Sequence, residues 1–108
     1  MTTYANTSYV AKNVGTSASS LTTVAGATTA AVASLIMCNT TTSPITTSVY
    51  ITRSGTDYYI VYGATVPVGG SLECIQGNRV VLIAGDALKV VNSAASSGDC
   101  VASVLLAA

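Results

Sequence analysis

The sequence contains no histidine, no tryptophan and no phenylalanine, and it has very few charged residues. Only 7% of its 108 residues are charged, compared with about 25% in ordinary soluble domains. The absence of histidine removes the side chain that most often exchanges protons near neutral pH. Six tyrosines are the only aromatic residues, and 16 threonines and 13 serines supply most of the polar groups. Hydroxyl groups therefore replace charges as the main source of solubility.

The balanced charge argues against nucleic-acid and membrane partners. Four basic and four acidic residues give zero net charge, and the basic ones are scattered, at Lys12, Arg53, Arg79 and Lys89. Nucleic-acid binding usually depends on clustered lysine and arginine that displace counterions from phosphates. The most apolar stretch, Ala30–Cys38, is far shorter than the ~20 residues of a membrane-spanning helix. The chain opens without the pattern of a secretory signal, so we expect assembly in a cytoplasm.

The three cysteines do not form a recognisable metal site. Cys38, Cys74 and Cys100 are far apart in the sequence, whereas metal sites usually combine closely spaced cysteines with histidine partners. We expect each thiol to be a small apolar side chain in a strand. A disulfide between two of them is the alternative, which a reducing compartment disfavours. We expect no metal and no other cofactor.

The acidic residues do not form a catalytic motif. Asp86 follows a glycine in a predicted turn, where its side chain can bond to the backbone. Glu73 and Asp57 flank turns at predicted strand ends, where a charge discourages edge-to-edge pairing. Asp99 closes a loop of serines and a glycine, and neither lysine lies in an S-x-x-K pattern that would activate a serine nucleophile. We therefore expect no catalytic residues and no enzyme.

The distribution of turn residues predicts an all-β fold. β-Branched residues dominate, glycine, serine and asparagine clusters recur every ~8–12 residues, and no segment shows the apolar stripe of an amphipathic helix. We expect an antiparallel β-sandwich, jelly-roll-like, with about eight short strands. Residues 1–20 predict a polar N-terminal arm with one strand near Ser8–Val14, and residues 21–108 a single β-sandwich domain. A hairpin is expected over Ile45–Tyr62, and the other strands at Leu21–Val24, Thr28–Asn39, Ser71–Ile75, Arg79–Ile83, Ala87–Val91 and Cys100–Leu106.

The predicted hairpin has a two-residue turn at Ser54-Gly55. This turn pairs Ile51 with Tyr58, and it places Tyr50 opposite Tyr59 on the other face. Continued along the strands, the same register pairs Val49 with Ile60 and Thr47 with Tyr62. The sequence therefore predicts that Tyr58 and Tyr62 lie on the core face, and that Tyr50 and Tyr59 lie on the outer one.

Four tyrosines are candidates for an interface. An aromatic pair on the outer face, Tyr50 and Tyr59, either packs under a second layer or contacts a partner, because tyrosine supplies area at little cost in entropy. Tyr4 and Tyr9 are the large side chains of the arm, and they are candidates to anchor it to a neighbouring molecule.

The scarcity of charge also bears on self-association. Soluble monomers usually carry ~25–35% charged residues on their surface and some net charge, which keep copies apart. We therefore expect much of the exterior to be covered by copies of this chain, as a homo-oligomer, or by a larger assembly. A monomer that stays soluble through its serines and threonines alone is the opposing interpretation.

Several turn-and-strand motifs resemble small virion structural proteins of tailed bacteriophages. The likeness runs from about Leu21 to Leu105 and rests on Thr52–Tyr59, Val66–Glu73, Gly77–Leu82, Ala84–Val90 and Ser103–Leu105. It implies a virion protein present in many copies, a capsid decoration or cement protein whose partners are copies of itself and other virion proteins such as the major capsid protein. A neck or tail component, and a carbohydrate- or receptor-binding module, are the alternatives.

Overall fold

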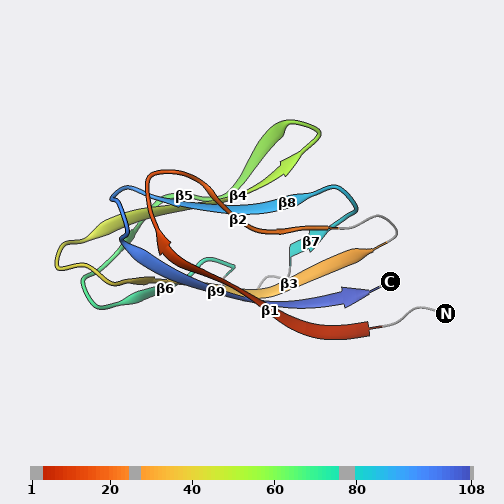
Figure 1. The fold of residues 1–108 in the computed structure, drawn as a ribbon, viewed down its shortest axis with the longest axis horizontal. Helices are drawn as coiled ribbons and strands as arrows, with labels where there is room; N and C mark the ends of the chain where they lie inside the picture. Colours follow the sequence, from red (N-terminus) through yellow and green to blue (C-terminus); the bar gives the residue numbers. More distant parts are fainter. Residues whose placement is uncertain (1–3, 25–27, 76–79, 108) are drawn as a thin grey trace.

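The computed structural model describes residues 4–24, 28–75 and 80–107, and in these ranges the chain forms two antiparallel β-sheets that pack face to face (Figure 1). No helix occurs in the described ranges, so none is present there that could cross a membrane. The strands are β1 (Tyr4–Val14), β2 (Ser19–Thr23), β3 (Thr29–Asn39), β4 (Ile45–Arg53), β5 (Thr56–Val66), β6 (Ser71–Glu73), β7 (Val80–Leu82), β8 (Ala87–Asn92) and β9 (Gly98–Ala107).

The strand order is that of a jelly roll. The first sheet, sheet A, has the order β1-β9-β3-β6, with β7 also paired to β3, and the second, sheet B, has the order β2-β8-β4-β5. The short strands β6 and β7 pair with different parts of β3, at Met37↔Leu72 and Ala31↔Val81. Together they fill one edge position, which gives two four-membered layers. The predicted all-β, jelly-roll-like sandwich is confirmed, and the described residues form nine strands where about eight were expected.

The segment expected as an N-terminal arm contains a longer strand than predicted. β1 begins at Tyr4 instead of near Ser8, and it pairs with β9 from Tyr4↔Ala107 to Val14↔Gly98. Residues 4–14 thus form an edge of sheet A. The reason is a two-residue alternation: Tyr9 and Ala11 pack against the core, while Val10 between them points outward and is 72% exposed.

The space between the sheets is filled by side chains of modest size. Alternate residues of the strands point inward, as expected for a sheet with one buried face. The sequence has no phenylalanine and no tryptophan, and the described core cluster is built from valine, leucine, alanine, isoleucine, methionine and cysteine. Its fully buried members include Val14, Val32, Leu35, Met37, Val49, Val66, Leu82, Leu88 and Val90.

The β4–β5 hairpin projects beyond the sandwich (Figure 1, green). Its tip has the predicted register, with Tyr50↔Tyr59 and Ile51↔Tyr58, but two irregularities further along give Val49↔Val61 and Thr47↔Ala64 instead of the predicted pairs. The prediction that Tyr58 and Tyr62 lie on the core face was wrong, since they are 57% and 78% exposed. Tyr58 lies on the projecting part of the hairpin, and the irregularities shift Tyr62 out of the predicted register.

Two of the predicted turns are confirmed. Ser54 and Gly55 have φ of 52° and 78°, the pair of positive angles that a type I′ hairpin turn requires. In the turn before β8, Gly85 has φ of 89° and the Asp86 N–H donates to the carbonyl of Ile83. The turns expected at Ala25-Gly26 and Gln76-Gly77-Asn78, and the start of a strand at Arg79, lie outside the described residues.

Gly98, at the start of β9, is the tightest point between the two sheets. A Cβ added there would lie 2.6 Å from the Asn92 amide nitrogen, 2.8 Å from the Met37 sulfur and 2.9 Å from the Cys38 carbonyl oxygen. Two of these neighbours are side chains, but the carbonyl belongs to the backbone of β3, which pairs with β9 at Asn39↔Gly98. Any side chain at this position would therefore force its neighbours, including the backbone of β3, to shift.

We expect Gly98→Ala to destabilise the fold by about 2 kcal/mol, in the usual range for overpacking of a close-packed interior. Chemical unfolding followed by circular dichroism measures the change. Ala95→Gly, at an exposed position of the preceding loop, is a control that changes the same two residue types. An unchanged unfolding midpoint in Gly98→Ala would show that the sheets can separate there without cost.

Candidate interaction surface

Three tyrosines gather on the outer face of sheet B. Tyr50 and Tyr59 face each other across β4 and β5 with ring centroids 5.0 Å apart, and Tyr59 meets Tyr62 edge-on, with centroids 4.9 Å apart and ring planes at 89°. We call Tyr50, Tyr59 and Tyr62 the tyrosine cluster. Tyr50 is buried, whereas Tyr59 is 50% and Tyr62 78% exposed. The rings of Tyr59 and Tyr62 are thus exposed to solvent, and Tyr59 packs against the buried ring of Tyr50.

Local backbone geometry explains why Tyr62 belongs to the tyrosine cluster. The register shifts between Thr47 and Val49 and again between Val49 and Tyr50, and Gly63 has a left-handed φ of 64°. A glycine within a predicted strand is a recognised sign of a bulge. Gly63 was therefore the signal in the sequence that could have placed Tyr62 beside Tyr59.

The cluster has few polar neighbours. Tyr50 pairs with Lys89 on its other side, and the Thr52 hydroxyl donates to the Asp57 carboxylate at 2.8 Å. Burial, and then the nearby Asp57 charge, raise the pKa of Tyr50 above its ordinary value. Tyr50 therefore remains a neutral phenol at physiological pH. Exposed tyrosines of this kind bury large area on binding and lose little entropy.

The sequence proposed four tyrosines for an interface, and the structure brings two of them together. Tyr50 and Tyr59 lie in the tyrosine cluster on sheet B. Tyr4 and Tyr9 lie on β1 in sheet A: the backbone of Tyr4 pairs with Ala107, and Tyr9 packs against the core. Tyr62, which the sequence did not select, is the most exposed of the described large hydrophobic side chains.

An ion pair that is buried on the side of Asp86 joins the projecting hairpin to the body of the sandwich. Arg53, at the end of β4, donates from Nε and Nη2 to the two oxygens of Asp86 at 2.8 and 2.6 Å. Asp86 is 1% exposed and also accepts a hydrogen bond from the Ile83 N–H at 2.9 Å. The bonds from Arg53, and then that from Ile83, lower the pKa of Asp86, and the same pair raises the pKa of Arg53.

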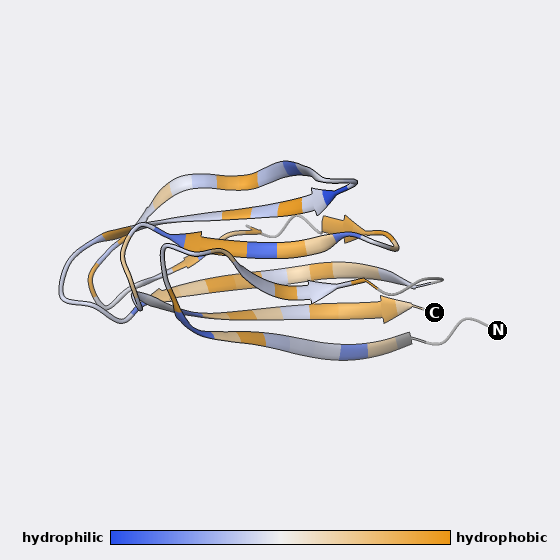
Figure 2. Ribbon diagram, turned by 45° about the horizontal axis from the view of Figure 1, so that its top comes forward, coloured by the Kyte–Doolittle hydropathy of each residue, from blue (hydrophilic) through white to orange (hydrophobic). Residues whose placement is uncertain are grey.

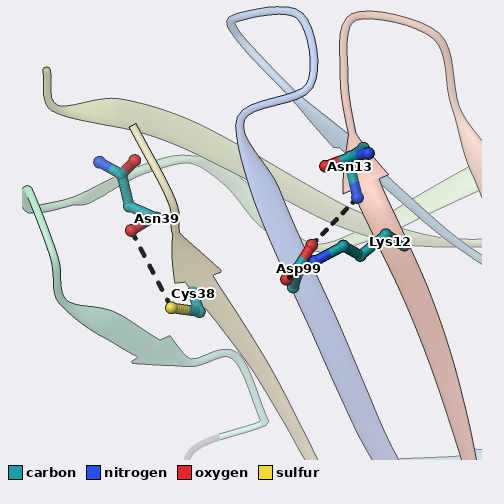
Figure 3. A network of polar contacts seen from close by, with 5 residues as sticks. All are labelled: Lys12, Asn13, Cys38, Asn39 and Asp99. Carbon is teal, nitrogen blue, oxygen red and sulfur yellow. Dashed lines mark hydrogen bonds and ion pairs between the residues drawn. The ribbon is translucent and has the colours of Figure 1, made fainter. Parts of the chain in front are cut away.

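A second ion pair links β1, at the edge of sheet A, to its neighbour β9. Lys12 Nζ lies 3.0 Å from an oxygen of Asp99, and the Asn13 N–H donates to the other oxygen at 3.0 Å (Figure 3). The bond from Asn13 and then that from Lys12 lower the pKa of Asp99. Glu73 accepts hydrogen bonds from the Leu35 and Ile75 N–H groups at 3.0 and 3.5 Å. With Asp57 bonded to Thr52, all four carboxylates have structural partners.

The thiols are protected by burial. All three cysteines are free; Cys74 and Cys100 are buried, and burial raises their pKa to about 11 and about 12. A protonated thiol is a poor nucleophile and a poor metal ligand. Cys38 is partly exposed on β3 (Figure 3). In the described part of the chain, no three His, Cys, Asp or Glu side chains come close enough to hold a metal ion.

No protein-family model and no curated protein matches the sequence. Among solved structures, the chain is similar to one from the disulfide-linked pili of Bacillus endospore appendages, with 14% identity, 99% of this chain and 88% of that chain covered, and a TM-score of 0.55. A chain in the structure of infectious bursal disease virus, Gx strain, has 11% identity, coverage of 99% and 37%, and a TM-score of 0.51. These two likenesses concern the fold alone. A pentameric capsid protein from metagenomic phage sequences has 17% identity, coverage of 93% and 59%, and a TM-score of 0.44, too low to bear on the fold.

The two ion pairs predict how stability depends on pH. The folded state lowers the pKa of Asp86 and Asp99, so the unfolded state binds protons first as the pH falls. Their contribution is therefore present above the unfolded aspartate pKa of about 3.9 and is lost as the pH falls through the lower folded values. We expect the melting temperature to be constant from pH 7 to about 5 and to fall below about 4.

We expect Asp86→Asn to reduce both the stability at neutral pH, by about 2 kcal/mol, and the steepness of the acid loss, because it removes charged hydrogen bonds. Thermal melts followed by circular dichroism between pH 2.5 and 7, for both proteins, provide the measurement. An acid profile that is identical in the wild type and Asp86→Asn would mean that Arg53 does not stabilise this carboxylate.

Proposed function

We propose that this chain is a structural protein of a bacteriophage virion, and specifically a capsid decoration or cement protein. It acts by adhesion, as a homo-oligomer whose other partners are virion proteins such as the major capsid protein. This role needs no catalytic centre, no metal and no cofactor.

The observation that supports this proposal best is the tyrosine cluster on its projecting hairpin. Tyr59 and Tyr62 expose aromatic area along β5, on the outer face of the β4–β5 hairpin. The charges near the cluster are of opposite sign, Asp57 and Lys89, so no excess of one charge opposes a partner. An aromatic anchor with polar groups beside it has the composition of a protein–protein contact.

The contacts of the ionisable side chains also support a structural role for this chain. In the described part of the chain, each carboxylate bonds to a cation, a hydroxyl or a backbone N–H, and the two buried thiols stay protonated. Groups that are engaged in holding turns and edges together are not available for proton transfer. The chains of similar fold come from a virus and from a pilus, both of which are assemblies of protein subunits.

A surface filament is the second candidate. The pilus chain matches 99% of this chain, and this chain covers 88% of it, so the two chains are similar in size as well as in fold. A filament subunit needs two different contact surfaces that repeat along an axis. The two candidates differ in where the protein is found, and one measurement separates them.

We expect the protein in purified virions, in many copies on the outside of the head. Mass spectrometry of gradient-purified particles measures its abundance, and cryo-electron microscopy of the same particles gives its position. Density in the neck or tail would exclude the decoration role and keep the virion assignment. Absence from virions, with the protein found in extracellular filaments, would overturn the proposal in favour of the second candidate.

We expect Tyr59→Ala combined with Tyr62→Ala to lower occupancy on the particle at least about tenfold, since interface aromatics often contribute about 2 kcal/mol or more each. Tyr58→Ala is the matched control, because Tyr58 is 57% exposed and neighbours Tyr59 on the same strand, but points to the opposite face. Equal loss in both variants, or loss in neither, would remove the tyrosine cluster from the contact.

A further inference from the structure

The outer face of sheet A carries side chains arranged in rows that cross its strands. Val10, Val101 and Ile36 are cross-strand neighbours on β1, β9 and β3, and they are 72%, 46% and 42% exposed. We call these three residues the apolar row. Exposed aliphatic side chains are common singly, but three side by side on one flat face indicate a contact surface.

The next row towards the end of β9 consists of hydroxyl groups. Ser103 pairs with Ser8 on one side and with Ser34 on the other, and we call these the serine row. Beyond it, Leu105 pairs with Asn6 and Ala31. An open groove of about 390 Å³ lies over this region, lined by Asn6, Thr7, Ser8, Ala33, Ser103, Val104 and Leu105. The groove borders the register shift between Val32 and Ser34, where the strand is irregular.

The apolar row and the groove are therefore on one face: the groove begins at the serine row and extends away from the apolar row. Successive rows on one face of a sheet are two residues, or about 6.8 Å, apart. A two-fold axis in the plane of contact, along the serine row, would lay the apolar row of one copy over the groove of another. Val101 would then meet Leu105, Ile36 would lie over the small Ala31, and Ser103 would face its own counterpart. Such a contact is self-complementary, because each pair is made twice.

Charge and size both fit a second copy of the chain. Among the described residues, the ionic groups of sheet A are Lys12 and Asp99, which are paired with each other at 3.0 Å, and Glu73 at the opposite edge, so these groups bring no accumulation of like charge when two copies meet. Ten residues along four strands give a flat area of roughly 33 by 17 Å, on the order of 1,100 Å² for two copies. Stable interfaces begin at about 1,200 Å², which fits a dimer of moderate affinity.

We propose that the outer face of sheet A is a homodimer interface, in which the apolar row of each copy seats in the groove of the other about a two-fold axis along the serine row. The partner is a second copy of this chain. The inference rests on the self-assembly that the proposed function requires, but it uses a different surface from the tyrosine cluster.

Sedimentation equilibrium of the purified protein tests the inference. We expect a reversible monomer–dimer equilibrium, and we expect Val101→Glu to weaken the association at least about tenfold by placing a charge on both sides of the contact. Val68→Glu is the matched control, because Val68 is 52% exposed and lies in the turn after β5, outside the face. Far-ultraviolet circular dichroism checks the folding of both. If Val101→Glu does not fold, Val101→Thr, which keeps the β-branched shape, is expected to weaken the dimer by a smaller factor.

Cross-linking tests the position of the axis. In a Cys38→Ser background, we expect Ser103→Cys to be joined efficiently to its counterpart by a short bis-maleimide, whereas Ser17→Cys, at an exposed position of the turn after β1, is not joined. A wild-type monomer at all concentrations, equal effects of the two glutamates, or equal cross-linking at both positions would each overturn the inference.

The same experiments keep the two proposals separate. A chain found on virions whose Val101→Glu variant still dimerises would end this inference and leave the proposed function standing. A Val101-dependent dimer of a chain that is absent from virions would have the opposite consequence.

Discussion

The pairing of β9 between β1 and β3 is the interaction on which the rest of the structure depends. β9 hydrogen-bonds to β1 along one edge and to β3 along the other. Because its side chains alternate, one register places Cys100, Ala102 and Val104 in the core and aligns Val101 and Ser103 with their neighbours outside. A slip of one residue would exchange these faces. Gly98 opposes such a slip at the start of the strand, since a larger residue there would force its neighbours to shift.

The few charged residues also join parts of the chain that are distant in sequence. Arg53 and Asp86 join the β4–β5 hairpin to the turn before β8, and Lys12 and Asp99 join β1 to β9. The first pair is shielded on the side of Asp86 and bonded through two parallel hydrogen bonds, which is the strongest arrangement of these groups. The second is open to solvent and contributes less. Both ion pairs lie at strand ends and loops. The core itself consists of apolar side chains, and the hydropathy of the strands that supply them is shown in Figure 2.

Much of the fold could be predicted from alternation and turn residues. The strands around Thr28–Asn39 and Ala87–Val91 were placed within a residue or two, because both are rich in apolar residues; in Ala87–Asn92 the buried side chains also alternate strictly. The strand of the arm was placed too short, since Tyr4 to Thr7 offered little apolar pattern, although pairing with β9 extends it. Pairing between distant strands is not encoded in any local window.

The candidate surfaces were predicted less well, for a physical reason. Tyr50 and Tyr59 were placed correctly because a two-residue turn fixes the register next to it. Tyr62 was misplaced because the bulges between it and the turn change the face of each later residue. The apolar row could not be found at all from the sequence, since Val10, Val101 and Ile36 become neighbours only when β9 enters between β1 and β3.

The two proposed surfaces lie on opposite layers of the sandwich, and this has a mechanical consequence. If two copies pack through the outer face of sheet A, both copies of sheet B face outward, and the two tyrosine clusters point away from each other. Such a dimer has two equivalent anchors held at a fixed separation by rigid sheets. When both anchors engage one assembly, the second contact forms at high effective concentration, and the attachment is much stronger than either contact alone. A small neutral domain with weak individual contacts can in this way hold neighbouring subunits of a larger particle together.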